Sequence, residues 1–188
     1  MRQLSSNVYT ETEIRGCDPS IVLTREGAVF IDTAQWITNL EQMIAFAEEK
    51  AGTIRYLVNT ESHIDHIFGN HWLKKAGAAI IGQEKILDGF FKIPPAFHMA
   101  THEYNVDVIR RQDPGALDRM PSEEEYLVAK PDIIFTDELT FRLGDHTFRC
   151  VHTPGHSPEQ TSVHVPEERC VFVGDNIFND CQIWLHSV

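Results

Sequence analysis

The chain has 188 residues, enough for one domain with a substantial core, and its 42% hydrophobic and 23% charged residues are typical of a globular protein. The net charge of -12 and the lack of a Lys/Arg-rich block argue against nucleic-acid binding by phosphate neutralisation. No segment approaches the roughly 18 apolar residues of a membrane span and no signal peptide is visible, so we expect a cytoplasmic protein without a membrane partner.

Strands and helices alternate in the first half of the chain. Two strands, Ser20–Thr24 and Ala28–Asp32, are predicted around a Glu-Gly turn. An amphipathic helix closed near Gly52 follows, because apolar residues recur at a spacing of three to four: Ile37, Leu40, Met43, Ile44 and Ala47. The next predicted elements are a strand, a short helix, a strand and a helix, at residues 54–59, 69–77, 78–82 and 83–91. This alternation predicts an α/β layered domain.

The alternation stops at a segment of about residues 92–131, which carries prolines, acidic clusters and partial helical periodicity. We interpret this segment as an insertion or lid over one edge of a single domain that spans residues 1–188. Strands separated by turn residues are predicted after it, at residues 132–135, 139–144, 146–153, 161–166 and 170–175.

The loop after the strand at residues 54–59 is rich in metal-ligating side chains. Glu61, His63, Asp65 and His66 fall within six consecutive residues. Histidine and carboxylate side chains bind zinc, iron or manganese in mixed nitrogen and oxygen sites. On extended backbone Glu61 and His63 face the same way, and the next two candidates lie where the chain turns into a helix. Such a cluster can serve two adjacent metal ions.

Two further candidates lie in the second half of the chain. His156 is in a Pro-Gly-His turn after one strand, and Asp175 directly follows another. Polar groups at strand ends, on loops fixed by a rigid scaffold, are typical of catalytic sites. The loop alone also admits a structural interpretation, in which Asp65 caps a helix beginning near Ile67.

These motifs resemble those of the metallo-β-lactamase-fold superfamily, whose pattern is His-x-His-x-Asp-His, then Pro-Gly-His, then Gly-Asp. The resemblance implies an αββα sandwich with a dinuclear site at one edge. It implies that Glu61, His63 and His156 hold the first metal ion, that Asp65 and His66 hold the second, and that Asp175 bridges both. The implied cofactors are two divalent ions, zinc foremost, with iron or manganese as alternatives because Glu61 is a harder ligand.

The sequence departs from the family pattern in two places. Glu61 stands where the family has histidine, so Glu61, Asp65 and Asp175 would bring a charge of −3 to the ions instead of the usual −2. The family also supplies a last histidine some tens of residues after Gly-Asp, whereas Val188 lies only 13 residues beyond Asp175. We therefore expect the C-terminal half of the sandwich to be incomplete in this sequence.

The resemblance implies a hydrolase in which a metal-bound hydroxide attacks an ester, thioester, lactone, phosphoester or related bond. Asp65 is the candidate catalytic residue, which would orient the hydroxide or relay a proton. The expected partner is a small-molecule substrate, and a homo-oligomer is compatible with the sequence. One alternative is a diiron-type oxidoreductase, although such relatives carry glutamate at the second motif position and a flavin domain. The other is a non-catalytic, incomplete scaffold.

Several other residues have two interpretations. Asp32, at a strand end, either orients a ligand histidine or is an ordinary turn residue. His71 is predicted at the surface or in helix packing, and His98 and His102 on a solvated helix face. The other histidines are predicted to face solvent or the sheet: His146, His152, His164 and His186. His98 and His102 would line a substrate pocket if the insertion is a lid. Phe90, Phe91 and Phe97 are predicted to close a core. The scattered cysteines are expected as reduced thiols: Cys17, Cys150, Cys170 and Cys181.

Overall fold

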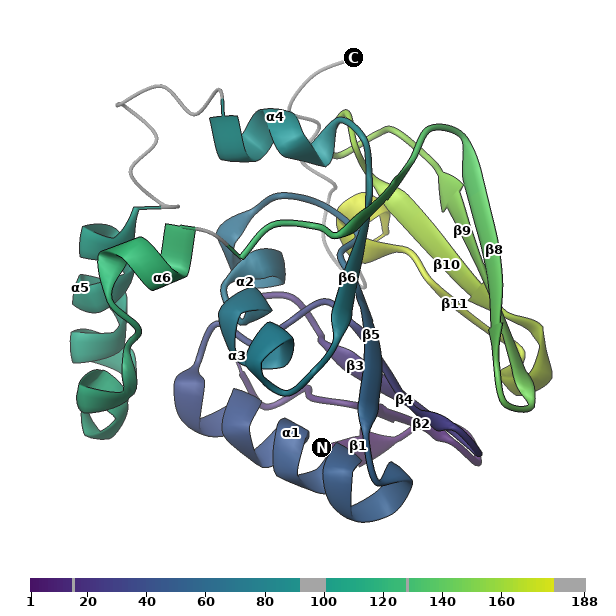
Figure 1. Ribbon diagram of the computed structural model, residues 1–188, viewed down its shortest axis with the longest axis horizontal. Helices are drawn as coiled ribbons and strands as arrows, with labels where there is room; N and C mark the ends of the chain where they lie inside the picture. Colours follow the sequence, from purple (N-terminus) through teal and green to yellow (C-terminus); the bar gives the residue numbers. More distant parts are fainter. Residues whose placement is uncertain (15, 92–100, 128, 178–188) are drawn as a thin grey trace.

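In the computed structural model, which describes residues 1–14, 16–91, 101–127 and 129–177, two β-sheets stack face to face (Figure 1). The larger sheet has the strand order β1-β2-β3-β4-β5-β6-β7 and the smaller the order β11-β10-β9-β8. The strands of the larger sheet are β1 (Arg2–Gln3), β2 (Val8–Thr10), β3 (Ser20–Thr24), β4 (Gly27–Ile31), β5 (Ile54–Val58), β6 (Ala79–Gln83) and β7 (Ile133–Phe135). Those of the smaller are β8 (Glu138–Leu143), β9 (His146–His152), β10 (Thr161–Val165) and β11 (Cys170–Phe172).

Parallel pairing in the larger sheet decides where the site lies. Strands β4, β5, β6 and β7 pair in parallel, whereas β1 to β4 and the whole smaller sheet pair antiparallel. Parallel strands need crossover connections, and their carboxyl ends meet at one edge of the sheet. Asp32, directly after β4, and the loop from Asn59, directly after β5, therefore emerge side by side. The backbone N–H of Asp32 donates to the carbonyl of Val58, 2.9 Å away.

Helix α1 (Ile37–Ala51) covers the outer face of the larger sheet. Four of its apolar residues are buried: Ile37, Leu40, Met43 and Ala47. The helix ends at Gly52, which is left-handed with φ of 76° and donates its N–H to the Glu48 carbonyl, a common helix end that glycine adopts without strain. Both the apolar spacing and the end of this helix are thus as the sequence predicts.

The main core lies between the two sheets. Val22, Val29 and Val58 of the larger sheet are buried against Phe148 and Val163 of the smaller. The strands of the smaller sheet alternate between buried and more exposed residues, the pattern of a sheet with one buried face. The predicted α/β sandwich is confirmed as a helix layer and two sheets. No helix of the described ranges covers the outer face of the smaller sheet.

The predicted insertion is helical where it is described. Helix α4 (Ile86–Phe91) precedes residues 92–100, and α5 (His102–Gln112), the 3₁₀ helix η2 (Pro114–Arg119) and α6 (Glu123–Leu127) follow them. The Asp113 carboxylate accepts hydrogen bonds from the backbone N–H and hydroxyl of Thr38, at 2.8 and 2.9 Å. Ile109 and Ala116 pack into a small core with Ile37. The described part is therefore anchored to α1, and its role as a lid stays a prediction.

Local structure differs from the sequence prediction in a few places. Strands β1 and β2 were not predicted, and a four-residue helix, α2 (Ile64–Ile67), precedes α3 (Asn70–Lys75). His63 is the residue before α2, so Asp65 lies inside the first turn of this helix, and the interpretation of Asp65 as a helix cap is wrong.

His146, predicted to face solvent or the sheet, is buried, with 3% exposure. Outside the described residues or side chains lie Phe90, Phe91, Phe97, His98, Cys181 and His186. Within the described ranges, no helix is long and apolar enough to span a bilayer.

Candidate metal centre

The candidate ligands meet at the edge where β5 ends and the smaller sheet begins. The extended segment after β5 carries Glu61 and His63, and α2 carries His66. The backbone N–H of Thr161, at the start of β10, donates to the Thr60 carbonyl at 2.8 Å. This bond joins the two sheets beside the site, and so brings the loop of His156 against the loop of Glu61.

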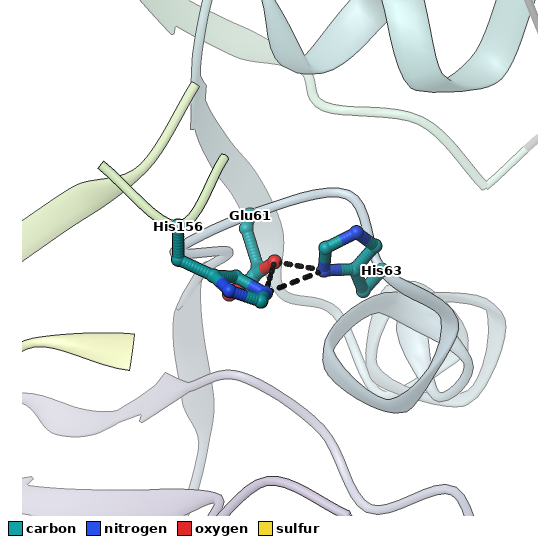
Figure 2. Close-up of side chains that lie close together, drawn as sticks. All are labelled: Glu61, His63 and His156. Carbon is teal, nitrogen blue, oxygen red and sulfur yellow. Dashed lines mark hydrogen bonds and ion pairs between the residues drawn. The ribbon is translucent and has the colours of Figure 1, made fainter. Parts of the chain in front are cut away.

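Glu61, His63 and His156 form one group of potential ligands (Figure 2), with one ligand atom of each lying within 4.8 Å of the others. Nε2 of His156 lies 3.2 Å from Nδ1 of His63 and 3.5 Å from Oε2 of Glu61, and the same oxygen contacts Nδ1 of His63. In Figure 2 the carboxylate and the two rings point toward one another. The three residues predicted for the first metal ion are therefore brought together.

A second group shares Glu61 and adds His66 and Asp175. Nε2 of His66 lies 3.5 Å from Oε1 of Glu61 and 3.4 Å from Oδ1 of Asp175. The other oxygen of Asp175 lies 3.7 Å from Nε2 of His156, which belongs to the first group. The two groups thus form one continuous cluster, with a carboxylate at each junction between them.

Burial and hydrogen bonding show that this cluster fits metal ions. The Glu61 side chain is fully buried, yet neither of its oxygens accepts a well-formed hydrogen bond from the described residues. Nε2 of His66 is also fully buried and likewise has no well-formed hydrogen bond from the described residues. A buried carboxylate whose close contact is a single imidazole, Nδ1 of His63, is destabilising unless another group or ion completes its environment. Divalent cations would satisfy these three atoms, and the donor set of imidazole and carboxylate is one that zinc, iron and manganese accept.

Asp32 orients His66. Nδ1 of His66 lies 2.9 Å from Oδ2 of Asp32, so its N–H donates to the carboxylate and Nε2 is left with the lone pair that a metal ion needs. Thr60 holds Asp32 in turn, with its backbone N–H at 2.7 Å and its hydroxyl at 2.6 Å. Asp32 has φ of 58°, a conformation that side chains other than glycine rarely adopt and that is enriched at functional sites. Of the two interpretations of Asp32, the structure supports the orienting one.

The loop of His156 is fixed by Asn176. The Asn176 side chain accepts the backbone N–H of His156 at 2.9 Å and donates to the carbonyl of Thr153 at 2.6 Å. Gly174, with φ of 51°, precedes Asp175, and a Cβ there would lie 2.2 Å from Nε2 of Gln160. A side chain at this position would clash with Gln160 and Thr60 and adopt a strained backbone, which favours glycine directly before Asp175.

Charges in the cluster stabilise one another. Burial alone would raise the pKa of Asp175, but the His66 imidazole and the positive charges of the other histidines outweigh it and lower this pKa. Burial likewise opposes protonation of His63, but the adjacent Glu61 carboxylate outweighs burial and raises the pKa of His63. The arrangement therefore attracts positive charge.

Comparison with known proteins agrees with this geometry. The family model described as the metallo-beta-lactamase superfamily matches residues 15–187. The chain belongs to this superfamily. Among solved structures, a metallo-beta-lactamase family protein from Thermus thermophilus superposes with a TM-score of 0.66 at 17% identity, covering 99% of this chain and 66% of that one.

The curated relatives that the chain matches include proteins named as hydrolases. Glyoxylase B2 of Dictyostelium discoideum is 29% identical over 142 residues, and a hydroxyacylglutathione hydrolase of Pelagibacter ubique (strain HTCC1062) is 27% identical over 138 residues. Each match covers 73% of this chain but only 40% and 42% of the respective relative. The chain thus spans less than half the length of these relatives.

Asp65 is the one predicted ligand that belongs to neither of the two ligand groups described above. The two ligand groups of the described residues leave it out. Its half-buried carboxylate lies instead beside Gly16, where an added Cβ would be 3.2 Å from Oδ2 of Asp65. Its function therefore stays a prediction.

The sequence analysis did not predict three residues that hold the site's loops and side chains by hydrogen bonds. They are Thr60, Glu159 and Asn176. Glu159 accepts hydrogen bonds from the backbone N–H and hydroxyl of Ser62, which ties the loop of Glu61 to that of His156. The available signal was position, since each is within one to three residues of a predicted ligand at a strand end.

Proposed function

We propose that the chain is a metal-dependent hydrolase that acts on thioesters, with two divalent ions, zinc foremost, as its cofactors. One observation carries this proposal. Two groups of ligand atoms share Glu61 and contain three buried polar atoms without a well-formed hydrogen bond from the described residues, although Oε2 of Glu61 contacts Nδ1 of His63. A structural cluster would satisfy these atoms internally, so their state favours a site that is completed by cations.

The chain's own residues would prepare the reaction. Bound divalent ions would lower the pKa of a coordinated water and polarise the substrate oxygen. Asp32 and Thr60 keep His66 in the tautomer that ligates through Nε2. Asn176 holds the backbone of His156, so that the ring of this residue stays in place in the first group. Such preorganisation removes the cost of reorganising the ligands during each turnover.

Thioesters are the substrate class that the relatives favour. The Pelagibacter relative is named for hydroxyacylglutathione, which is a thioester of glutathione. A cleft of about 450 Å³ lies beside the ligand loop, lined by Gly16, Gln35, Tyr104, Val108, Arg111 and Gln112. Gly16 also contacts the Asp65 side chain. We propose that α5, which supplies four of the lining residues, forms a wall of the substrate site, as the lid prediction requires.

Asp65 is proposed to hold a proton during turnover. Its carboxylate is half-buried, lies next to His66 in the chain, and borders Gly16 at the edge of the cleft. General acid–base catalysis requires such a group within reach of substrate and solvent.

Elemental analysis and a substrate panel test the proposal. The purified chain should carry two zinc ions, and a thioester should be hydrolysed faster than an ester, lactone, phosphodiester or β-lactam. A chelator should abolish this activity and zinc should restore it. Activity that survives complete metal removal would contradict the proposal. Bound iron with a visible absorption band and no hydrolysis would favour the diiron oxidoreductase instead.

A further inference from the structure

We propose that Arg111, on α5, binds a carboxylate carried by the non-reacting part of the thioester substrate, so that the cleft beside the ligand loop selects anionic thioesters over neutral ones. This inference rests on the proposed thioester hydrolysis and adds the residue that recognises the substrate. The residues that line the cleft carry a single charge, the guanidinium of Arg111, although the chain has a net charge of -12. A cleft lined without acidic side chains in so acidic a chain is suited to an anion.

The guanidinium of Arg111 is available to a ligand. Its Nε donates to the backbone carbonyl of Asp107 at 3.0 Å, which fixes the side chain along the helix and leaves the two terminal nitrogens as donors. The Asp107 carboxylate pairs with Arg110 instead, and none of the described residues forms an ion pair with Arg111. An arginine held in this way presents a planar pair of donors that matches a carboxylate. A single cation also suits a single carboxylate better than the several phosphates of a coenzyme A carrier.

Other residues of the same wall add hydrogen-bond donors. Tyr104, Val108 and Arg111 are spaced four and three residues apart, so they lie on the same face of α5. The side-chain oxygen of Gln112 accepts from the Trp36 indole N–H at 2.9 Å, which leaves the amide N–H groups of Gln112 for another acceptor. The cleft volume of about 450 Å³ is in the range of small-molecule sites.

The cleft is joined to the metal centre through Gly16. A Cβ added to Gly16 would lie 3.0 Å from Cβ of Asp65, and the thiol of the neighbouring Cys17 donates to the Asp65 carbonyl at 3.0 Å. These contacts hold the Gly16 wall of the cleft against α2, the helix that carries the candidate ligand His66. A substrate whose thioester lies at the metal centre can therefore extend past Gly16 toward α5.

The test compares Arg111→Gln with Arg110→Gln, which removes the same charge from the adjacent residue. Arg110 is not among the residues that line the cleft, and both arginines lie in the last turn of α5, so a contribution to helix stability is shared. The zinc-loaded proteins are assayed with acyl thioesters of ω-mercapto carboxylic acids of increasing chain length, each paired with the neutral amide of the same thiol. The measured quantity is the ratio of kcat/KM for the acid to kcat/KM for the amide, which does not depend on the fraction of active enzyme.

We expect this ratio to fall about 10-fold in Arg111→Gln, at the chain length that reaches the guanidinium, and to stay at the wild-type value in Arg110→Gln. Arg111→Lys should give an intermediate ratio, because its ammonium keeps the charge but lacks the planar pair of donors. Higher salt should lower the wild-type ratio and leave the ratio of Arg111→Gln nearly constant, since the exposed guanidinium is screened by ions.

Two outcomes would overturn the role of Arg111 while hydrolysis of the amides still supported the proposed function. One is an unchanged ratio in Arg111→Gln at every chain length, and the other is an equal fall in Arg110→Gln. A defect of Arg111→Gln confined to acyl-coenzyme A, relative to acyl-pantetheine, would assign the residue to phosphate and overturn the carboxylate.

Binding separates this inference from the proposed function. A wild-type chain that hydrolyses no thioester would overturn the proposed function. Calorimetry with the corresponding thioethers, which cannot be hydrolysed, would still measure the preference for the acid over the amide. Loss of this preference in Arg111→Gln alone would support the carboxylate site, and its absence in the wild type would overturn it.

Discussion

Two buried histidine–carboxylate clusters lie near opposite ends of β9, and they differ in how well their atoms are satisfied. At one end, His66 and Glu61 are fully buried, and both present atoms without well-formed hydrogen bonds. At the other end, His146 is also buried, but its Nδ1 lies 3.0 Å from Asp145 and its Nε2 lies 2.8 Å from Glu168. Both ring nitrogens therefore have a protein partner.

The carboxylate of Glu168 is equally well satisfied. It accepts hydrogen bonds from the hydroxyl of Ser5 and from the side-chain and backbone N–H groups of Asn7. This cluster ties the N-terminal strands to the smaller sheet, which is a structural function. The comparison shows that a buried histidine beside carboxylates does not by itself indicate a metal site. The number of buried atoms left without a partner separates the two cases.

The largest effect is expected from substitutions that remove metal ligands and leave the His146 cluster intact. His63→Ala and Asp175→Ala should each lose most of their bound metal, with affinity reduced by more than about 100-fold, because a direct ligand matters more than its outer support. Metal content is measured by elemental analysis of the purified variants. Glu168→Gln is the matched control and should keep full metal content. Unchanged metal in both alanine variants would reject the site.

An intermediate effect is expected from substitution of Asp32, which hydrogen-bonds to the His66 ring. Asp32→Asn should reduce affinity for the second ion about 10–100-fold, because the amide holds the ring and its tautomer less firmly than a carboxylate does. Zinc titration with a chromophoric competitor measures the affinity. Asp18→Asn, a carboxylate change outside both ligand groups, is the control. If Asp32→Asn bound both ions like the wild type, Asp32 would be an ordinary turn residue.

Much of the fold follows from patterns that the sequence carries locally. The apolar spacing and terminal glycine of α1, and the strands β3 and β5, depend on neighbouring residues and were predicted to within a residue or so. Helix α2 has only four residues, which is too short for a periodicity to be visible. Strands β1 and β2 are shorter still and carry little pattern.

The site was predictable where motifs recur and unpredictable where distant atoms meet. The three motifs indicated that His63, His156 and Asp175 would converge, and the structure places them together. The direction of Asp65 depends on where α2 begins, and the hydrogen bond from His156 to Asn176 spans 20 positions. His146 was expected at the solvent or the sheet because its partner Glu168 is 22 residues away. Such pairings become visible only when the chain is folded.

The smallest expected effect concerns acid stability of the satisfied cluster. Burial would raise the pKa of Glu168, but hydrogen bonds from Ser5, Asn7 and His146 outweigh it and lower the pKa to about 2, from an ordinary value of 4.5. A carboxylate with a lowered pKa stabilises the fold above its unfolded pKa, and that stabilisation is lost as pH falls through the folded value. At neutral pH, Glu168→Gln should therefore cost about 1–2 kcal/mol of unfolding free energy.

The pH dependence of this difference is the decisive measurement. Urea unfolding of the metal-free wild type and Glu168→Gln should give free energies that converge as pH falls from about 4.5 toward about 2, because only the wild type loses the charged carboxylate. Glu167→Gln is the control, since Glu167 accepts a hydrogen bond from the backbone N–H of Thr147 but is exposed, so loss of its charge should change the unfolding free energy less. A gap that stayed constant over this pH range would mean that the bonds to Glu168 do not depend on its charge, and that the cluster stabilises the fold through packing alone.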